Sequence, residues 1–293
     1  MTVVVGYRAG KVGLSGLHLA IRAARTLGTS LTVATIVPKP WLTPSLGRID
    51  AEYEHWADHL AADSAKEAAR YLHNLADGIE VTYFHRAHRS VSGGLIEVLE
   101  QVGAAELLVL GSLPSGRRGQ VVIGSTADWL LHASPVPVAI SPPGYRSYTG
   151  RLARLTCAYS ATPVSIDVVR RCFEFAERFG LPVRVLTFVV RGKTMYPPEV
   201  GTEVEDSILD AWASQAREIL ESLKTEGTVS EDVVLQVVTG HSWTEALNRA
   251  DWEDGEMLAL GTSPRGDVRR VFLGSRSGKI IRHSPVPVMV LPG

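Results

Sequence analysis

Short apolar runs rich in β-branched residues alternate along this chain with longer stretches in which apolar residues recur at helical spacing. The runs of the first half are predicted as five strands, at 2–6, 31–37, 79–85, 106–111 and 136–140. The second half has five more, at 153–158, 182–190, 232–238, 256–261 and 286–290. The longest helical stretches lie between them, at about 14–27, 50–76, 163–179 and 203–226. Strands that alternate with helices predict βαβ units and parallel sheets.

The two halves of the chain repeat each other. The pentapeptide SPVPV occurs at 134–138 and again at 284–288, and the run LTVATIV at 31–37 aligns with VRVLTFV at 183–189. This period is far longer than that of a solenoid repeat, so each copy is predicted to be a whole domain. The stretch SPPGYRSYTGR, rich in Pro, Gly and Ser, is typical of a linker. The predicted boundaries are domain 1 at 1–143, a linker at 144–151 and domain 2 at 152–293.

Each half is predicted to be an α/β domain with an open, doubly wound (Rossmann-like), five-stranded parallel sheet. Its fifth strand is expected at the sheet edge, because Pro135 and Pro137, and their copies in the second half, remove N–H donors from one side. Val136 and Val138 are then expected to donate to the inner neighbour. Since an exposed apolar edge invites aggregation, the two edges are expected to cover each other in an intramolecular pseudo-dimer.

The composition is that of an ordinary soluble globular protein, with 45% hydrophobic residues, 21% charged residues and a net charge of -1. Without a strong positive charge, an electrostatic grip on nucleic acid is not expected. No apolar run approaches the roughly 18 residues of a membrane span, and the start MTVVVGYRAG lacks the pattern of a signal peptide. Cys157 and Cys172 are too few for a disulfide framework. They are expected as buried free thiols, as in a reducing cytoplasm.

The candidate chemistry lies in two copies of a glycine-rich loop. GSLPSGRRGQVVIGS at 111–125 and GTSPRGDVRRVFLGS at 261–275 each follow a fourth strand and lead into a short helix. Glycine lets a backbone approach an anion closely, and a helix that begins near Ser125 or Ser275 adds free N–H groups and the positive end of its dipole. The same residues also suit a strand-to-helix turn that binds nothing. The loop by itself leaves both interpretations open.

The loops and their flanks resemble those of the universal stress protein family. Nucleotide-binding members carry Gly, two residues, Gly, nine residues and then Gly-Ser or Gly-Thr after the fourth strand. The outer residues of this pattern are present in both halves, as Gly111, Gly124 and Ser125 and as Gly261, Gly274 and Ser275. The flanks LLVLGS, LALGTS and SPVPV are similar too, and the resemblance covers nearly the whole chain as a tandem two-domain member. It implies a stress-response protein, with ATP or another adenine nucleotide as the ligand of binding members.

Both halves depart from the family's binding pattern at two places. Pro114 and Pro264 replace the middle glycine, which removes an N–H donor and fixes φ. Arg8 and Ser160 stand where binding members carry an Asp at the end of the first strand. Arg8 cannot accept a hydrogen bond, whereas the hydroxyl of Ser160 can do so in part.

The second half keeps more of the family's site. The residue whose backbone meets the adenine corresponds to Ile36 or Phe188, and the position two after the loop serine is Ala127 or Ser277. Arginines that suit either phosphate or solvent crowd both loops, as Arg117, Arg118, Arg265, Arg269 and Arg270. The nucleotide-site residues that the resemblance implies are Ser160, Phe188, Gly261, Thr262, Gly274, Ser275 and Ser277 in the second half and Ile36, Gly111, Gly124 and Ser125 in the first.

No catalytic or metal-binding set stands out. The chain has no G-x-S-x-G elbow, no Walker motif and no H-E-x-x-H, and His85, His88 and His241 lack a metal-ligand spacing. The first hypothesis is a non-catalytic cytoplasmic stress-response protein that acts through contacts with an unknown protein partner and has degenerate nucleotide loops. The alternative is an ATP-binding regulator that uses mainly the second domain, and a weak ATPase is a third. The long helical stretches at 50–76 and 203–226 could also support a homodimer.

Overall fold

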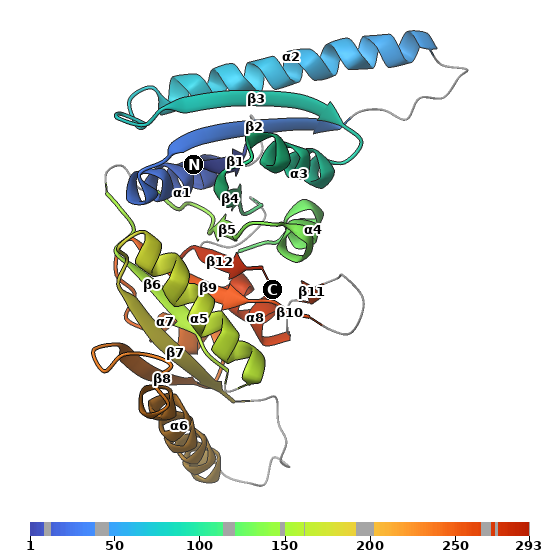
Figure 1. Cartoon of the computed structure of the whole chain (residues 1–293). Coiled ribbons are helices and arrows are strands. Elements are labelled where there is room, and N and C mark those ends of the chain that lie inside the picture. The colour runs from blue at the N-terminus through green and yellow to red at the C-terminus, as the bar shows by residue number, and fades with distance from the viewer. Residues whose placement is uncertain are drawn as a thin grey trace. The chain divides into compact units, whose positions relative to one another are not determined.

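The computed structural model describes residues 1–8, 13–38, 47–113, 121–146, 150–160, 162–191, 202–264, 271–272 and 275–292. The described chain divides into two compact units. Unit 1 is built on Met1–Arg151, and unit 2 on Leu152–Asp267 and Phe272–Leu291. In Figure 1 the first runs from blue to green and the second from yellow to red.

Unit 1 alternates strands and helices along the chain (Figure 1). Its strands are β1 (Thr2–Gly6), β2 (Ser30–Pro38), β3 (Val81–His88), β4 (Ala105–Gly111) and β5 (Val138–Ser141). Its helices are α1 (Leu14–Leu27), α2 (Gly47–Leu72), α3 (Val91–Val102) and α4 (Ser125–Ala133). The strands pair in parallel in the order β3-β2-β1-β4-β5, so β5 lies at the edge of the unit's own sheet.

Unit 2 repeats this architecture. Its strands are β6 (Arg154–Ala158), β7 (Val183–Val190), β8 (Val234–Gly240), β9 (Glu256–Gly261) and β12 (Val288–Leu291). Its helices are α5 (Pro163–Arg178), α6 (Thr202–Thr225), α7 (Trp243–Asn248) and α8 (Ser275–His283). The parallel order is β8-β7-β6-β9-β12, which matches unit 1 copy for copy. The predicted fold class, two tandem doubly wound α/β domains, is confirmed.

The sheets form the core of each unit. Val3, Val4 and Val5 of β1 have no exposed surface, and neither do Leu155 and Cys157 of β6. Successive strand residues point to opposite faces, so a strand buried at every position must be covered on both sides. This burial explains why the strands read as continuous apolar runs.

The N-terminus of α5, which follows β6, is fixed by a capping box and a proline. Thr162 caps its N-terminus by accepting a hydrogen bond from the N–H of Ser165 at 3.3 Å. The hydroxyl of Ser165 accepts in return from the N–H of Thr162 at 2.9 Å, which completes a capping box. Pro163 occupies the first turn, where its missing N–H is not needed. The start of α5 is thereby fixed directly after β6.

The fifth strands begin later than predicted. In unit 1, β5 starts at Val138 rather than at Val136. The N–H of Val136 donates to Ser134 Oγ at 3.3 Å instead of joining the ladder, and Ser134 Oγ donates back to the carbonyl of Val136 at 2.7 Å. A serine-centred turn therefore precedes the strand, and the expected donation by Val136 to the inner strand is wrong. The packing of the two sheet edges on each other stays a prediction.

Candidate functional site

Each unit carries a cleft at the carboxyl ends of its strands, the edge at which open parallel sheets bind ligands. The cleft of unit 2 has a volume of about 760 Å³, and that of unit 1 about 290 Å³. Small-molecule sites occupy about 300–1,000 Å³. The cleft of unit 2 therefore has room for a nucleotide, whereas the volume of the unit 1 cleft lies at the lower limit for small-molecule sites.

Most of the residues implied for the nucleotide site of the second half meet in the cleft of unit 2. The lining includes Ser160, Phe188, Gly261, Ser275 and Ser277. These residues come from the end of β6, from β7, from the end of β9 and from the start of α8. The fold thus brings together positions that are far apart in the sequence.

Two other implied residues have different placements. Thr262 is 2% exposed, and its hydroxyl donates to the carbonyl of Leu291 at 3.3 Å, so it ties the end of β9 to β12 behind the cleft wall. Gly274 lies outside the described residues, as do Pro114 and the five loop arginines. Pro264 belongs to a short two-stranded sheet, β10 (Ser263–Pro264) with β11 (Val271–Phe272), so part of this loop is an extended ladder.

The start of α8 makes one part of the unit 2 cleft suitable for an anion. Ser275 is the first residue of the helix, Arg276 follows it, and both are exposed, while Ser277 is half-buried. The first turn contains no acidic residue. A helix N-terminus has unpaired N–H groups and partial positive charge, and arginine adds a full charge and bidentate donors. No described residue that lines this cleft is an Asp or Glu.

Aromatic side chains supply another part of the same cleft. Phe188 of β7 and Trp243 of α7 are half-buried, with ring centroids 6.4 Å apart and planes inclined at 55°. Trp212, on α6, is 45% exposed and also lines the cleft. Planar rings of this kind offer stacking surfaces to a base. Sequence reasoning missed the contribution of α6, and the exposed tryptophan on a polar helix was the available signal.

Gly261 has a packing role as well as a place in the lining. A Cβ atom at this position would lie 1.9 Å from Cγ2 of Val168 on α5. In unit 1 the equivalent contact is between Gly16 of α1 and Gly111, where a Cβ on Gly16 would lie 3.1 Å from the Gly111 nitrogen. In unit 2 the strand glycine, Gly261, therefore lets a helix pack closely on the sheet, and in unit 1 the helix glycine, Gly16, does so, whether or not a ligand binds.

The cleft of unit 1 contains the four residues implied for the first half. Ile36, Gly111, Gly124 and Ser125 line it. Leu113 also lines this cleft and packs against Gly124, since a Cβ on Gly124 would lie 3.1 Å from its Cδ1.

The charges around the unit 1 cleft differ from those in unit 2. The first turn of α4 contains Asp128, an acidic residue with no counterpart in the first turn of α8. Gly124 is the N-cap and makes no side-chain cap, while Ser125 is the first helical residue. Arg8 lines the cleft at the position where unit 2 has the exposed Ser160. An arginine there cannot hydrogen-bond a ribose hydroxyl as an acceptor.

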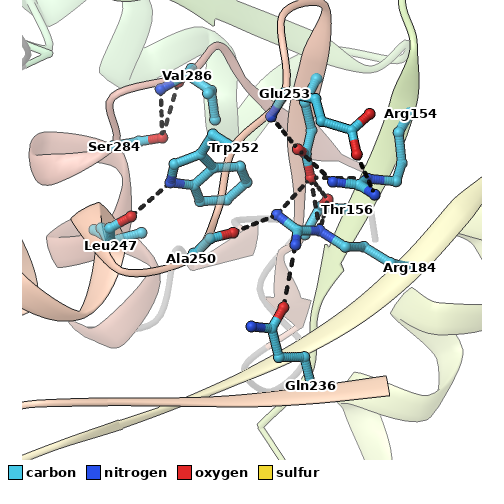
Figure 2. Close-up of polar contacts among 11 residues, drawn as sticks. Arg154, Thr156, Arg184, Gln236, Leu247, Ala250, Trp252, Glu253, Ser284 and Val286 are labelled. Atoms are coloured by element: carbon cyan, nitrogen blue, oxygen red, sulfur yellow. Dashed lines mark hydrogen bonds and ion pairs between the residues drawn. The ribbon is translucent and has the colours of Figure 1, made fainter. Parts of the chain in front are cut away.

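A buried ion-pair network lies at the opposite, amino-terminal ends of the unit 2 strands (Figure 2). Glu256 accepts from Nε of Arg184 at 2.7 Å and from Nη2 of Arg154 at 2.9 Å, and also from the hydroxyl of Thr156. The Glu256 side chain has no exposed surface, and that of Arg184 is 3% exposed. Arg184 also donates to the Ala250 carbonyl at 2.8 Å.

The hydrogen bonds of this network decide the charge state of Glu256. Burial alone would raise the pKa of Glu256, but hydrogen bonds from Arg154, Thr156 and the N–H of Glu253, together with the Arg184 charge, lower it below its ordinary value. Burial lowers the pKa of Arg184, and the negative charge of Glu256 opposes this effect. This network was not predicted from the sequence, although charged residues such as Arg184 within apolar runs were a signal.

Two of the three histidines considered from sequence, His88 and His241, make hydrogen bonds or ion pairs. His88 Nε2 lies 3.1 Å from Oε1 of Glu97, and its Nδ1 accepts from the N–H of Ser90 at 3.1 Å. The backbone N–H of His241 donates to Glu245 at 2.9 Å. Over the part of the chain that the structure describes, no three His, Cys, Asp or Glu residues form a group that could hold a metal. The described helices include none that is both long and apolar enough to cross a membrane.

Tandem open α/β units, each with a cleft at the carboxyl ends of its strands, define a duplicated, doubly wound α/β protein. The sequence model described as "Universal stress protein family" matches residues 1–142 and 153–292. This match spans both units. The chain therefore belongs to the universal stress protein family.

Its relatives include two mycobacterial proteins of the same length. They are called Universal stress protein Rv2319c, from Mycobacterium tuberculosis, and Universal stress protein Mb2346c, from Mycobacterium bovis. Each is 70% identical over 293 residues, which are 100% of both chains.

Solved structures share the fold at much lower identity. A universal stress protein from Archaeoglobus fulgidus is 16% identical with a TM-score of 0.57, over 99% of this chain and 98% of that chain. A Pseudomonas aeruginosa protein described as functionally unknown is 14% identical with a TM-score of 0.60, over 99% and 92%. These two structures support the fold alone.

Proposed function

We propose that this chain is a non-catalytic stress-response protein that binds an adenine nucleotide in the cleft of unit 2. One observation carries the proposal: a single cleft of about 760 Å³ combines aromatic rings with a helix N-terminus, hydroxyls and an arginine. A nucleotide has the matching chemistry, since it joins a planar base to an anionic phosphate chain. Phe188, Trp212 and Trp243 would contact the base, and Ser275, Arg276 and Ser277 the phosphates.

Unit 1 is proposed not to bind a nucleotide. Its cleft is less than half as large, and the acidic Asp128 in the first turn of α4 opposes the dipole that would attract phosphate. Arg8 replaces the acceptor that a ribose requires. The proposed stoichiometry is therefore one nucleotide per chain.

A second candidate is a ligand-free protein that acts only through protein contacts. Pro264 in place of the middle glycine favours it, and so does the packing role of Gly261, which explains that glycine without a ligand. A weak ATPase is less well supported, because phosphoryl transfer needs a carboxylate that holds Mg²⁺ and no Asp or Glu is among the described lining of unit 2.

Isothermal titration calorimetry of the full chain with ATP, ADP and AMP tests the proposal, using Ser275→Asp and its matched control Ser125→Asp. Both serines are exposed, and each is the first residue of its helix. An acidic residue in the first turn of a helix is favourable, so both variants should fold.

The two variants should differ in ATP affinity. A carboxylate at position 275 repels phosphate, and two unit charges about 4 Å apart interact by about 4 kcal/mol near a protein surface, so a loss of at least about tenfold is expected. Ser125→Asp should bind as the wild type does. No binding to the wild type would favour the ligand-free candidate, and an equal loss in both variants would contradict the assignment to unit 2.

A further inference from the structure

Two histidines face each other on the exposed surface of α2 in unit 1. His55 and His59, in the sequence HWADH, are four residues apart, which puts them on one face of the helix one turn from each other. Their Nε2 atoms share a hydrogen bond at 3.0 Å, so a cation bound by both nitrogens takes the place of the shared proton, and their rings meet edge to face with centroids 4.4 Å apart and planes at 87°. Two imidazole nitrogens are therefore close enough to bind one cation together.

The distance between the two nitrogens indicates a geometry for a shared cation. With metal–nitrogen bonds of about 2.0–2.1 Å, ligands at a right angle lie about 2.8–3.0 Å apart, whereas tetrahedral ligands lie about 3.3–3.4 Å apart. The observed 3.0 Å fits neighbouring positions of a square-planar or octahedral ion. Imidazole in this geometry suits Cu²⁺ and Ni²⁺, while Mg²⁺ and Ca²⁺ prefer oxygen ligands.

We propose that His55 and His59 chelate a late first-row divalent cation such as Ni²⁺ or Cu²⁺. Among the described residues, no third His, Cys, Asp or Glu joins the pair, so the proposal rests on these two protein ligands. Both side chains are exposed, which gives the ion free entry and exit. The exposed Asp58, next to His59 in the chain, adds negative charge nearby. The site binds its metal exchangeably rather than as a structural ion.

The proposed metal site is separate from the proposed nucleotide site, which belongs to unit 2. The second imidazole binds a metal that the first already holds, so its binding is intramolecular and strengthens the complex well beyond one histidine. This chelate effect distinguishes the pair from isolated surface histidines among the nine of the chain. Removing either member should remove it.

Calorimetric titration of the full chain, free of any affinity tag, with NiCl₂ tests the proposal. His55→Ala and His59→Ala each place the best helix former at an exposed position, so the fold is kept. His73→Ala removes an exposed histidine just beyond α2. The double variant Trp56→His/His59→Ala keeps the number of histidines but places them at adjacent positions, which do not face each other on a helix.

The wild type should bind Ni²⁺ at this pair, and MgCl₂ should produce no binding there. His55→Ala, His59→Ala and the double variant should each weaken Ni²⁺ binding at least about tenfold. His73→Ala should leave it unchanged. Equal affinity of the wild type and His59→Ala, or recovery of wild-type affinity in the double variant, would overturn the proposal.

Discussion

Replacing Glu256 with Gln should destabilise unit 2 more than any change to a surface ion pair. The substitution keeps the size of the side chain but removes the negative charge from a position without exposed surface. Arg154 is 19% exposed and keeps its ion pair with Glu253 at 2.9 Å. Arg184, which is 3% exposed, loses its carboxylate partner Glu256 and keeps neutral acceptors at Thr156, Gln236 and Ala250.

The expected magnitude follows from the burial of Arg184. Breaking one partner out of a buried ion pair typically costs about 3–5 kcal/mol, because the other charge remains buried and uncompensated. The neutral acceptors that Arg184 keeps place the expected loss of stability near the lower end, at about 3 kcal/mol. Asp167→Asn is the control, since the Asp167–Arg170 pair spans 3.5 Å between side chains that are 64% and 61% exposed. That change should cost less than about 0.5 kcal/mol.

Urea unfolding, followed by circular dichroism and tryptophan fluorescence, measures both changes. Glu256→Gln should lower the midpoint of the unit 2 transition strongly at an unchanged m-value, and Asp167→Asn should scarcely move it. A loss of less than about 1 kcal/mol for Glu256→Gln would refute the view that this network holds a compensated buried charge.

Glu256, Gly261 and Ser90 each allow a further test of the structure. The pKa of Glu256 is lowered in the folded state, so the stability that its charge contributes should be complete above the unfolded carboxyl pKa of about 4.3 and should be lost as the pH falls through the folded pKa. The urea midpoint of the wild type should therefore drop more steeply from pH 5 to pH 3 than that of Glu256→Gln. Parallel midpoint curves for the two proteins would contradict this prediction. Gly261→Ala should destabilise the protein by about 1–3 kcal/mol because its methyl group meets Val168, and Val168→Ala in the same chain should restore part of the loss of melting temperature. Ser90→Ala should cost about 1 kcal/mol in urea unfolding because it removes the cap on Gly93 N–H, whereas Ser90→Asp should retain stability; equal losses would argue against capping.

The fold could be predicted because several independent signals agree in both copies. Continuous apolar runs indicated strands that are buried on both faces, and the repeated SPVPV indicated the fifth strand in each copy. The exact start of that strand could not be predicted. Ser134 offers the backbone of Val136 a local hydrogen bond that competes with the ladder, and such side-chain competition leaves no periodic pattern in the sequence.

The candidate site was predictable where it follows a loop motif and unpredictable where it depends on distant packing. Ser160, Gly261 and Ser275 follow strand ends or begin a helix, so topology alone brings them to one edge. Trp212 reaches the cleft from a long polar helix, and its position depends on how α6 packs on the sheet. The sizes of the two clefts, about 760 Å³ and about 290 Å³, likewise depend on packing that no local sequence pattern encodes.

Native mass spectrometry of the full chain equilibrated with ATP tests the central claim most directly, because it counts ligands per chain. With ATP near the wild-type dissociation constant, the proposed function predicts no more than one adenine nucleotide per chain, with equal occupancy for the wild type and Ser125→Asp and much lower occupancy for Ser275→Asp. A wild-type chain that carries no nucleotide, a chain that carries two, or a Ser275→Asp chain that is occupied as fully as the wild type would contradict it.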